Sequence, residues 1–244
     1  MSKKERLDKI LANMGYGSRK DVKKFIKDGR VRVNNLVILD NEFKVSPYED
    51  EIFFGEEEVL YREYIYLMMN KPQGLVSSTD DPRTKTVIDL LDKEHLIYKP
   101  FPVGRLDKDT EGLLLISNDG KLAHELLSPK KGVNKKYYAE VDGYVEDKYI
   151  EAFKEGVTLD DGYKTLPADL EIINGNIISK VYLTIQEGKF HQVKRMFESI
   201  GMKVLFLKRV SMGPLELDIT LKSGEYRELT EVEINLLKNH VSMI

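Results

Sequence analysis

The chain has 244 residues, 41% hydrophobic and 32% charged, a composition typical of a globular protein with room for a large domain and a small one. It has no cysteine and four histidines without an HxxxH or HxH pair, which excludes disulfides and thiol nucleophiles and predicts no metal site. No apolar run approaches the ~20 residues that span a bilayer, and the charged N-terminus lacks a signal peptide's apolar segment, so we expect a cytoplasmic protein that binds no membrane.

The net charge of −3 conceals a sharp division along the chain. Residues 1–34 contain eleven Lys and Arg against four acids, a net charge of +7, whereas residues 35–60 carry a net charge of −7. A separation this sharp indicates a face at the N-terminus that binds a polyanion.

The N-terminal segment predicts two helices followed by a hairpin. The spacing of apolar residues predicts a helix over Leu7–Met14. Ser18 and Asp21 have the spacing of a capping box, which predicts the start of a second helix. Strands over Val31–Val33 and Leu36–Leu39 are predicted to follow.

The second predicted helix carries most of the basic charge. Its lysines and arginine could form a solvated face, but like charges repel and few acids lie between them. Phosphate binding is the better account, and such binding weakens steeply with salt because each neutralised phosphate releases counterions.

Arg6–Asn34, RLDKILANMGYGSRKDVKKFIKDGRVRVN, resembles the S4 RNA-binding domain in its SR…I..G.V.VN pattern. The resemblance implies structured ribosomal RNA as the partner and implies no catalysis. The candidate RNA-binding residues are Arg6, Lys9, Ser18, Arg19, Lys20, Lys23, Lys24, Lys27, Arg30 and Arg32. The acidic stretch Gly55–Glu63 is the predicted linker, which places an S4-like domain at residues 1–60 and a larger domain at 61–244.

From residue 64 onward, strand patterns are separated by only a few helices. The predicted strands are Ile65–Met69, Leu113–Ile116, Tyr137–Val141, Ile177–Ile185 and Val204–Leu207, with a turn at Asn70–Gly74, a short helix opening at Val87–Leu91 and a helix over Val193–Ile200. Lys93–Pro100 is predicted as a loop or short helix, and Lys121–Lys131 as a helix with a basic loop. This order predicts an α+β protein whose larger domain has a mixed, mainly antiparallel sheet with flanking helices.

Three carboxylates, Asp107, Asp109 and Glu111, crowd the segment before the predicted buried strand Leu113–Ile116. A carboxylate at the entry to a buried strand would be partly desolvated, which raises its pKa, while a nearby cation opposes that shift. A rigid carboxylate of this kind can act as an acid, a base or a nucleophile. The same density of acids is also typical of a solvated turn, and position alone does not choose among the three.

A second polar segment is EGKFHQVKRMFESIG, Glu187–Gly201. Lys194 could pair with Glu198 four residues later on a helix surface, worth a few tenths of a kcal/mol. His191 could equally be a helix-start or core histidine. The residues alone leave these structural alternatives open.

Four motifs together are similar to the pseudouridine synthases of the ribosomal small-subunit synthase A type. They occur in family order, and with RVSMGPLEL, GEYRELT and the S4-like start the resemblance covers nearly the whole chain. The four motifs are NKPQGLVSS (Asn70–Ser78), VGRLDKDTEGLLLISNDG (Val103–Gly120), KKYYAEV (Lys135–Val141) and EGKFHQVKRMF (Glu187–Phe197).

The resemblance implies a role for individual residues. Asp107 would be the catalytic carboxylate, Tyr137 would stack on the uracil ring and assist removal of the C5 proton, and Lys194 would pair with Asp107. Asp109 and Glu111 would then be local scaffold. The implied substrate-binding residues are Arg105, Lys189, His191, Gln192 and Arg195, of which Arg105 and Lys189 would contact phosphates.

The implied reaction is isomerisation of a uridine within RNA. The N1–C1′ bond breaks, the uracil rotates and C5 bonds to C1′, which requires no cofactor. Asp107 would attack C1′ or remove a proton from C2′, and the sequence does not choose between these steps. The target uridine would be flipped out of its stack, at a cost of a few kcal/mol.

The residues of the last motif, Glu187–Phe197, indicate the substrate. His191, Gln192 and Lys194 resemble the motif of the small-subunit enzymes, which implies 16S rRNA rather than 23S rRNA as the substrate, free or in a small-subunit assembly particle, and we expect a monomer. A non-catalytic RNA-binding or ribosome-assembly protein is the alternative from another class. A glycoside hydrolase using Asp107 with a second carboxylate is a third possibility, which requires two opposed carboxyls.

Overall fold

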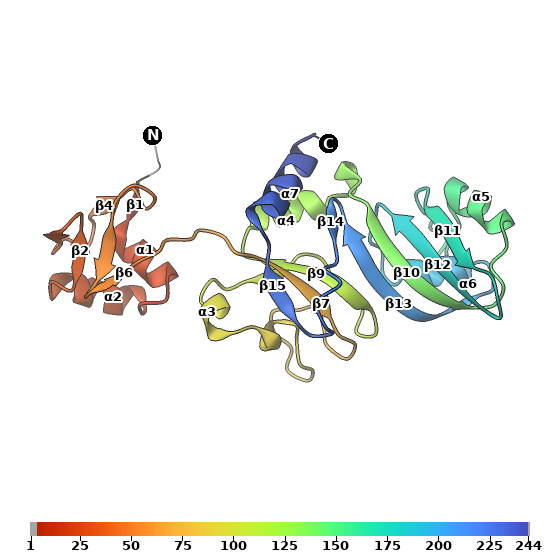
Figure 1. The fold of residues 1–244 in the computed structure, drawn as a ribbon, viewed down its shortest axis with the longest axis horizontal. Helices are drawn as coiled ribbons and strands as arrows, with labels where there is room; N and C mark the ends of the chain where they lie inside the picture. Colours follow the sequence, from red (N-terminus) through yellow and green to blue (C-terminus); the bar gives the residue numbers. More distant parts are fainter. Residues whose placement is uncertain (1–3, 244) are drawn as a thin grey trace. The chain divides into compact units, whose positions relative to one another are not determined.

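The computed structural model describes residues 4–243, so Lys3 of the basic segment lies outside the described residues. The chain divides into two compact units (Figure 1). The first holds the described residues up to Ile65 together with Asp92–Lys99, and the second holds Tyr66–Leu91 and the described residues from Pro100 onward. None of the described helices combines the length and apolar character needed to cross a membrane.

Short strands and helices build the first unit around one apolar core. Its four-stranded antiparallel sheet has the order β3-β2-β5-β6, and β1 pairs separately with β4. Its elements are β1 (Glu5–Arg6), α1 (Leu7–Asn13), α2 (Arg19–Lys27), β2 (Val31–Val33), β3 (Leu36–Val37), β4 (Lys44–Val45), β5 (Ile52–Phe54), β6 (Glu57–Glu58) and α3 (Lys93–Leu96). The predicted apolar stripe of α1 is buried in this core.

Local sequence signals in this unit are largely confirmed. The Ser18 hydroxyl accepts a hydrogen bond from the Asp21 N–H and the Asp21 carboxylate accepts one from the Ser18 N–H, so the capping box forms. The predicted linker is wrong in its first half, because β6 pairs with β5 and Val59 is buried in the core. The acidic residues of β6 are exposed, so their charge does not prevent strand formation.

A nine-stranded sheet forms the second unit and confirms the predicted mixed, mainly antiparallel α+β fold. The order is β11-β12-β10-β13-β9-β7-β15, with β14 on β13 and β8 on β9. The elements are β7 (Tyr66–Lys71), η1 (Ile88–Leu90), β8 (Phe101–Pro102), β9 (Glu111–Ser117), α4 (Gly120–Leu127), η2 (Pro129–Lys131), β10 (Lys135–Asp142), α5 (Lys148–Glu155), β11 (Asp169–Asn174), β12 (Ile178–Ile185), α6 (Gln192–Glu198), β13 (Lys203–Met212), β14 (Leu215–Glu216), β15 (Tyr226–Glu228) and α7 (Glu231–Met243).

One parallel pairing, β9 with β13, joins the two halves of this sheet. Gly112 has a φ of +101°, and a Cβ there would lie 2.2 Å from the Arg209 carbonyl oxygen, so the strands approach this closely only at glycine. The Arg209 side chain is buried, and its Nε donates to the Leu113 carbonyl at 2.8 Å. This junction places the turn that precedes β9 beside the β10–β13 half of the sheet.

Alternation along β10 assigns its side chains to two faces. Lys135, Tyr137, Ala139 and Val141 are buried, whereas the residues between them are partly exposed. Successive residues of a strand point to opposite faces of the sheet. The two faces of β10 therefore present different surfaces, one of which contributes to the candidate active site.

Candidate active site

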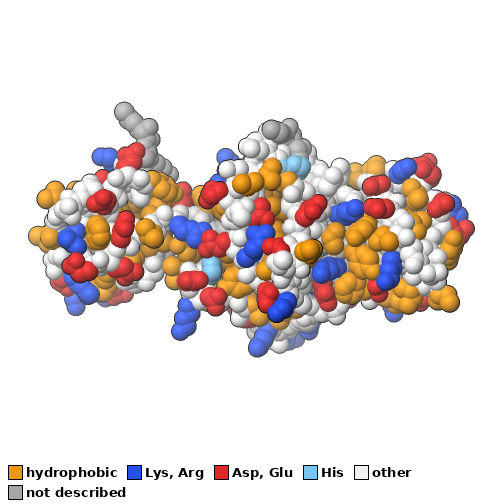
Figure 2. All heavy atoms as spheres, viewed as in Figure 1, with side chains coloured by type: hydrophobic (Ala, Val, Ile, Leu, Met, Phe, Trp, Pro, Cys, Tyr) orange, Lys and Arg blue, Asp and Glu red, His pale blue; other side chains and the backbone are white. Residues whose placement is uncertain are grey.

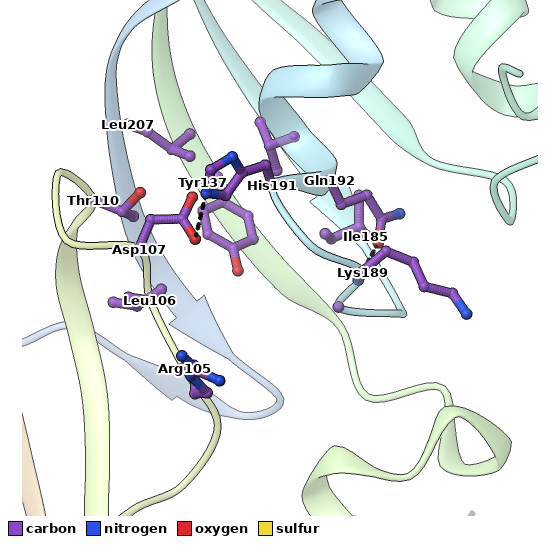
Figure 3. Close-up of a pocket in the computed structure, with 12 residues that line it drawn as sticks. Arg105, Leu106, Asp107, Thr110, Tyr137, Ile185, Lys189, His191, Gln192 and Leu207 are labelled. Carbon is purple, nitrogen blue, oxygen red and sulfur yellow. Dashed lines mark hydrogen bonds and ion pairs between the residues drawn. The ribbon is translucent and has the colours of Figure 1, made fainter. Parts of the chain in front are cut away.

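A pocket lies between the turn that precedes β9, the strand β10 and the start of α6 (Figure 3). Six of the eight residues predicted for catalysis and substrate binding line it, namely Arg105, Asp107, Tyr137, Lys189, His191 and Gln192. The Tyr137 ring is buried and lies next to the Asp107 carboxylate (Figure 3). The tertiary structure thus brings together residues that are more than 80 positions apart in the sequence.

Lys194 lies between two carboxylates of the turn before β9. Its Nζ is 3.1 Å from Asp107 Oδ2 and 2.6 Å from Asp109 Oδ1. Burial lowers the pKa of Lys194, but hydrogen bonds to Asp109 and Asp107 outweigh this and raise it. The hydrogen bond from Lys194 lowers the pKa of Asp109, so that carboxylate is ionised near neutral pH. The pairing links α6 to this turn, in place of the alternative contact with Glu198.

Asp109 is therefore closer to Lys194 than Asp107 is. The sequence interpretation treated Asp109 as local scaffold and gave it no contact with the lysine. The two acids share one ammonium group, but Asp107 lines the pocket and Asp109 does not. Asp109 therefore has the closer contact with Lys194, whereas Asp107 is the acid that lines the pocket.

His191 lies on the same side of the pocket as Asp107. It begins α6 in a left-handed conformation, with φ of 49°, and its Nε2 lies 3.7 Å from Asp107 Oδ1. Its ring stacks on Phe190 with centroids 3.8 Å apart and an angle of 18° between the planes. Phe190 is 75% exposed, so this stack forms an aromatic surface beside the pocket. Sequence reasoning missed Phe190, although an aromatic residue in a polar turn was a usable signal.

Gln192 lines the pocket and also holds the turn before α6. It is buried, its Oε1 accepts from the Lys189 N–H at 2.9 Å, and its Nε2 donates to Glu187 Oε1 at 2.8 Å. Lys189 extends outward, with its Nζ 4.4 Å from the centroid of the Tyr163 ring. Gln192 and Lys189 therefore both line the pocket and both contact other side chains of the protein.

Arg195 and Arg105 differ from each other in position. The Arg195 guanidinium forms ion pairs with Asp160 and Asp161, and the residue does not line the pocket. These acids, with the hydrogen bond that Arg195 donates to Asp161 as the largest cause, raise the pKa of Arg195. Arg105 is exposed at the pocket, where a phosphate could reach it. The predicted substrate contact of Arg195 stays a prediction.

Lys71 supports the turn that carries Asp107. It is buried, and its Nζ donates to the carbonyl oxygens of Pro72, Asp107 and Thr110 at 3.0, 3.1 and 3.0 Å. Burial lowers its pKa to about 8. The predicted turn at Asn70–Gly74 is wrong for its first two residues, which end β7, because Asn70 and Lys71 pair with β9.

Ser77, from the same NKPQGLVSS motif, holds the residue before Asp107. Its hydroxyl donates to the Leu106 carbonyl at 3.0 Å and accepts from the Leu106 N–H at 3.1 Å. The motif thus positions the backbone on either side of the Asp107 carboxylate. The sequence alone indicates no role for this motif.

The candidate RNA-binding residues of the first unit fall into two groups. The exposed lysines of α2 are Lys20, Lys23, Lys24 and Lys27. The others take part in contacts within the unit: Arg6 with Asp8 and Glu42, Lys9 with Glu5, Arg19 with Asp8, Arg32 with Glu56, Arg30 over the rings of Phe25 and Phe54, and Ser18 in the capping box. The four α2 lysines are therefore the cations of this set best placed for phosphate.

One group of possible metal ligands occurs in the part of the chain that the structure describes. Asp92, Glu94 and His95 bring ligand atoms within 4.8 Å of one another. Asp92 and Glu94 are exposed, and none of the three residues is among those that line the pocket around Asp107.

The chain is similar to known proteins over most of its length. A family model described as RNA pseudouridylate synthase matches residues 65–199, and an S4 domain model matches residues 5–52. The Bacillus subtilis protein named "Uncharacterized RNA pseudouridine synthase YtzG" is 52% identical over 95% of this chain and 98% of its own length.

More distant relatives and a solved structure show the same similarity. The ribosomal small subunit pseudouridine synthases A of Vibrio cholerae and Escherichia coli K12 are each 41% identical over 94% of this chain, covering 97% and 98% of their own lengths. A crystal structure of a pseudouridylate synthase, 40% identical, covers 95% of this chain and 99% of its own with a TM-score of 0.67. The chain therefore belongs to the RNA pseudouridine synthase family of isomerases and carries an S4 domain.

Proposed function

We propose that this pseudouridine synthase isomerises one uridine of 16S rRNA and uses Asp107 as its catalytic carboxylate. The observation that carries the proposal is the Asp107–Lys194 ion pair of 3.1 Å beside the Tyr137 ring. Relatives named ribosomal small subunit pseudouridine synthase A, aligned over nearly the whole chain, support the choice of substrate.

Lys194 holds the Asp107 carboxylate aimed into the pocket through their 3.1 Å ion pair. A carboxylate oxygen of Asp107 attacks C1′ of the uridine or removes the C2′ proton, and either step breaks the N1–C1′ bond so that the uracil leaves C1′. Asp109 also pairs with the Lys194 ammonium, at 2.6 Å. Lys194 is thus held in place whether or not the Asp107 oxygen is engaged with the sugar.

Tyr137 stacks on the released uracil while the ring turns and assists removal of the C5 proton after C5 bonds to C1′. Its ring is held by β10, so the surface on which the base turns is rigid. Arg105 and Lys189 bind phosphates on either side of the flipped nucleotide. His191 and Gln192 complete the wall of the pocket.

An aromatic stack lies at the rim of the pocket, which has a volume of about 70 Å³. Phe190 and His191 form the exposed stack beside it. In the complex, Phe190 leaves His191 and fills the space that the flipped uridine leaves in the RNA stack, which offsets part of the flipping cost of a few kcal/mol.

The test is incubation of the protein with unmodified 16S rRNA carrying tritium at uridine C5. Release of tritium from 16S rRNA, but not from 23S rRNA treated in parallel, is the expected result because C5 exchanges its hydrogen for C1′. Chemical mapping of pseudouridine in cells lacking the gene should show the loss of one small-subunit position. An unchanged map, or complementation of the deletion by Asp107→Asn, would support a non-catalytic RNA-binding role instead.

A further inference from the structure

A second cavity lies on the opposite face of the sheet from the active-site pocket. Tyr137 lines the pocket, whereas its neighbours on β10, Lys136 and Tyr138, line this cavity. The cavity has a volume of about 490 Å³, within the range of ~300–1,000 Å³ that is typical of ligand sites. Residues of β7, β10, β12, β13 and the loop after β14 form its walls.

Aromatic rings and lysines make up one wall of the cavity. Tyr138 and Tyr182 lie on paired strands with ring centroids 5.9 Å apart at an angle of 65°, and both are partly exposed. Lys136 Nζ lies 4.3 Å from the Tyr182 ring centroid, and Lys208 also lines the cavity. Figure 2 shows hydrophobic side chains flanked by Lys or Arg over β10 and β13. Rings that stack on bases beside cations that meet phosphates are typical of sites for unpaired nucleic acid.

Asn70 supplies an unused hydrogen-bond acceptor in the same cavity. It is 5% exposed, and its Nδ2 donates to the Leu221 carbonyl oxygen at 2.8 Å. Among the described residues, no group donates to its Oδ1. A buried acceptor without a donor is unfavourable, and the N–H groups of a nucleobase would satisfy it.

The acidic residues at the cavity leave its lysines available. Asp218 accepts hydrogen bonds from Arg227 at 2.7 Å and from the Thr220 hydroxyl at 2.7 Å, so its charge is already balanced. Lys136 pairs with Glu171 at 3.1 Å, an exposed contact that a phosphate could replace. Glu216 is exposed at the edge of the cavity and can accept from base amino groups.

We propose that this cavity binds an unpaired nucleotide of the same RNA whose uridine enters the pocket at Asp107. The base stacks on Tyr138 and Tyr182 and meets Asn70, and its phosphate binds Lys208. The proposal rests on the proposed function for the identity of the RNA. Because the two sites lie on opposite faces of one sheet, the RNA is held from both sides. A continuous duplex cannot bind in this way, so the substrate segment includes a loop or junction.

The first test measures binding of protein-free 16S rRNA and tritium release from it. Tyr182→Ala removes a stacking ring, and the double change Lys136→Gln with Lys208→Gln removes two charges from surface side chains. Tyr182→Ala should raise the Kd about tenfold, since stacking on one aromatic ring is worth roughly that factor or more. The double lysine change should also raise the Kd about tenfold, because it removes charges that attract phosphates. In both variants kcat should stay within about twofold of wild type. Lys180→Gln is the matched control, because Lys180 lies on the same face of β12 but outside the cavity. It should leave the Kd unchanged.

A second test makes the result independent of folding and of turnover. The wild-type protein is crosslinked to 16S rRNA containing 4-thiouridine, and crosslinks at Tyr138 or Tyr182 are expected. An unchanged Kd in both variants without such crosslinks would overturn the cavity site, while continued tritium release would leave the proposed function standing. Weakened binding to an assembly particle but not to free rRNA would also overturn it, by assigning the cavity to a protein contact. Absence of tritium release from wild-type protein would count against the proposed function alone, because crosslinking still reports on the cavity.

Discussion

Two basic regions of this enzyme hold their charge in opposite ways. On α2, Lys20, Lys23, Lys24 and Lys27 are all exposed, and each contributes a similar, screened attraction to a polyanion. Beside the pocket, Lys194 is only 17% exposed and is held between Asp107 and a second acid. Loss of one α2 lysine leaves three others, but nothing substitutes for the pair in the pocket. We therefore expect RNA affinity to be distributed over α2, whereas the proposed chemistry depends on a few fixed atoms.

Asp107→Asn should have the largest effect on activity. The change keeps the shape of the side chain and removes the ionised oxygen, so tritium release should fall about 10³-fold or more, while binding of 16S rRNA stays within about twofold. Asp109→Asn is the control, since it also contacts Lys194 but does not line the pocket. Its loss of kcat should stay within about tenfold. An equal loss in both variants would mean that Asp107 has no special role.

Lys71→Met should have the next largest effect. Methionine keeps an unbranched side chain but removes the ammonium that holds the carbonyls of Asp107 and Thr110. A shift of the turn by about 1 Å can cost roughly 10²-fold in rate, so kcat should fall by about that factor with little change in KM. Lys108→Met, an exposed lysine on the same turn, is the control and should retain activity. Wild-type kcat in Lys71→Met would show that the turn does not need its support.

Replacing the four α2 lysines by glutamine tests whether these exposed lysines bind phosphates. Each phosphate contact contributes about 0.7–0.9 to the slope of log Kd against log salt, so the slope should become shallower by about three. The value of kcat at saturating RNA should not change. Changing Lys148 and Lys154 on α5, which pair with Glu146 and Glu151, to glutamine provides the control and should leave the slope as it is. A steep slope that persists in the α2 variant would place the phosphate contacts elsewhere.

Phe190→Ala tests the rim of the pocket. Removing the ring that fills the vacated space in the RNA should lower kcat/KM about tenfold, because a single aromatic stack is worth about that factor. Phe190→Trp preserves a stacking surface and should retain most of the activity. Equal activity of the alanine and tryptophan variants would indicate that Phe190 does not enter the RNA.

The smallest effect concerns stability against pH. Burial lowers the pKa of Lys71 to about 8 in the folded protein, whereas an unfolded lysine titrates near 10.4. Between these values the unfolded chain binds more protons than the folded one, so this lysine makes the free energy of unfolding rise with pH. From pH 7.5 to 9.5, urea unfolding should show wild type gaining about 2 kcal/mol relative to Lys71→Met. A constant difference between the two proteins would show that the folded pKa of Lys71 is not lowered.

Local patterns predicted the elements whose signals lie within a few residues. The apolar stripe of α1 and the capping box of α2 depend on neighbours three or four positions away, and both are confirmed. Strand ends were less predictable, because a strand continues for as long as its partner does. Asn70 and Lys71 look like part of a turn, yet β9 extends β7 through them. Likewise, Glu57 and Glu58 look like a linker but pair with β5.

The sequence by itself determined the fold class and the family, because both follow from patterns and motifs that can be read along the chain. It also selected Asp107, but only through the resemblance, since Asp109 and Glu111 are equally plausible by position. Only the tertiary structure decided which groups meet: Lys194 between two acids, Lys71 under the turn, and the cavity behind Tyr137. These contacts join segments far apart in sequence, and their geometry depends on strand pairing and burial that no local pattern records.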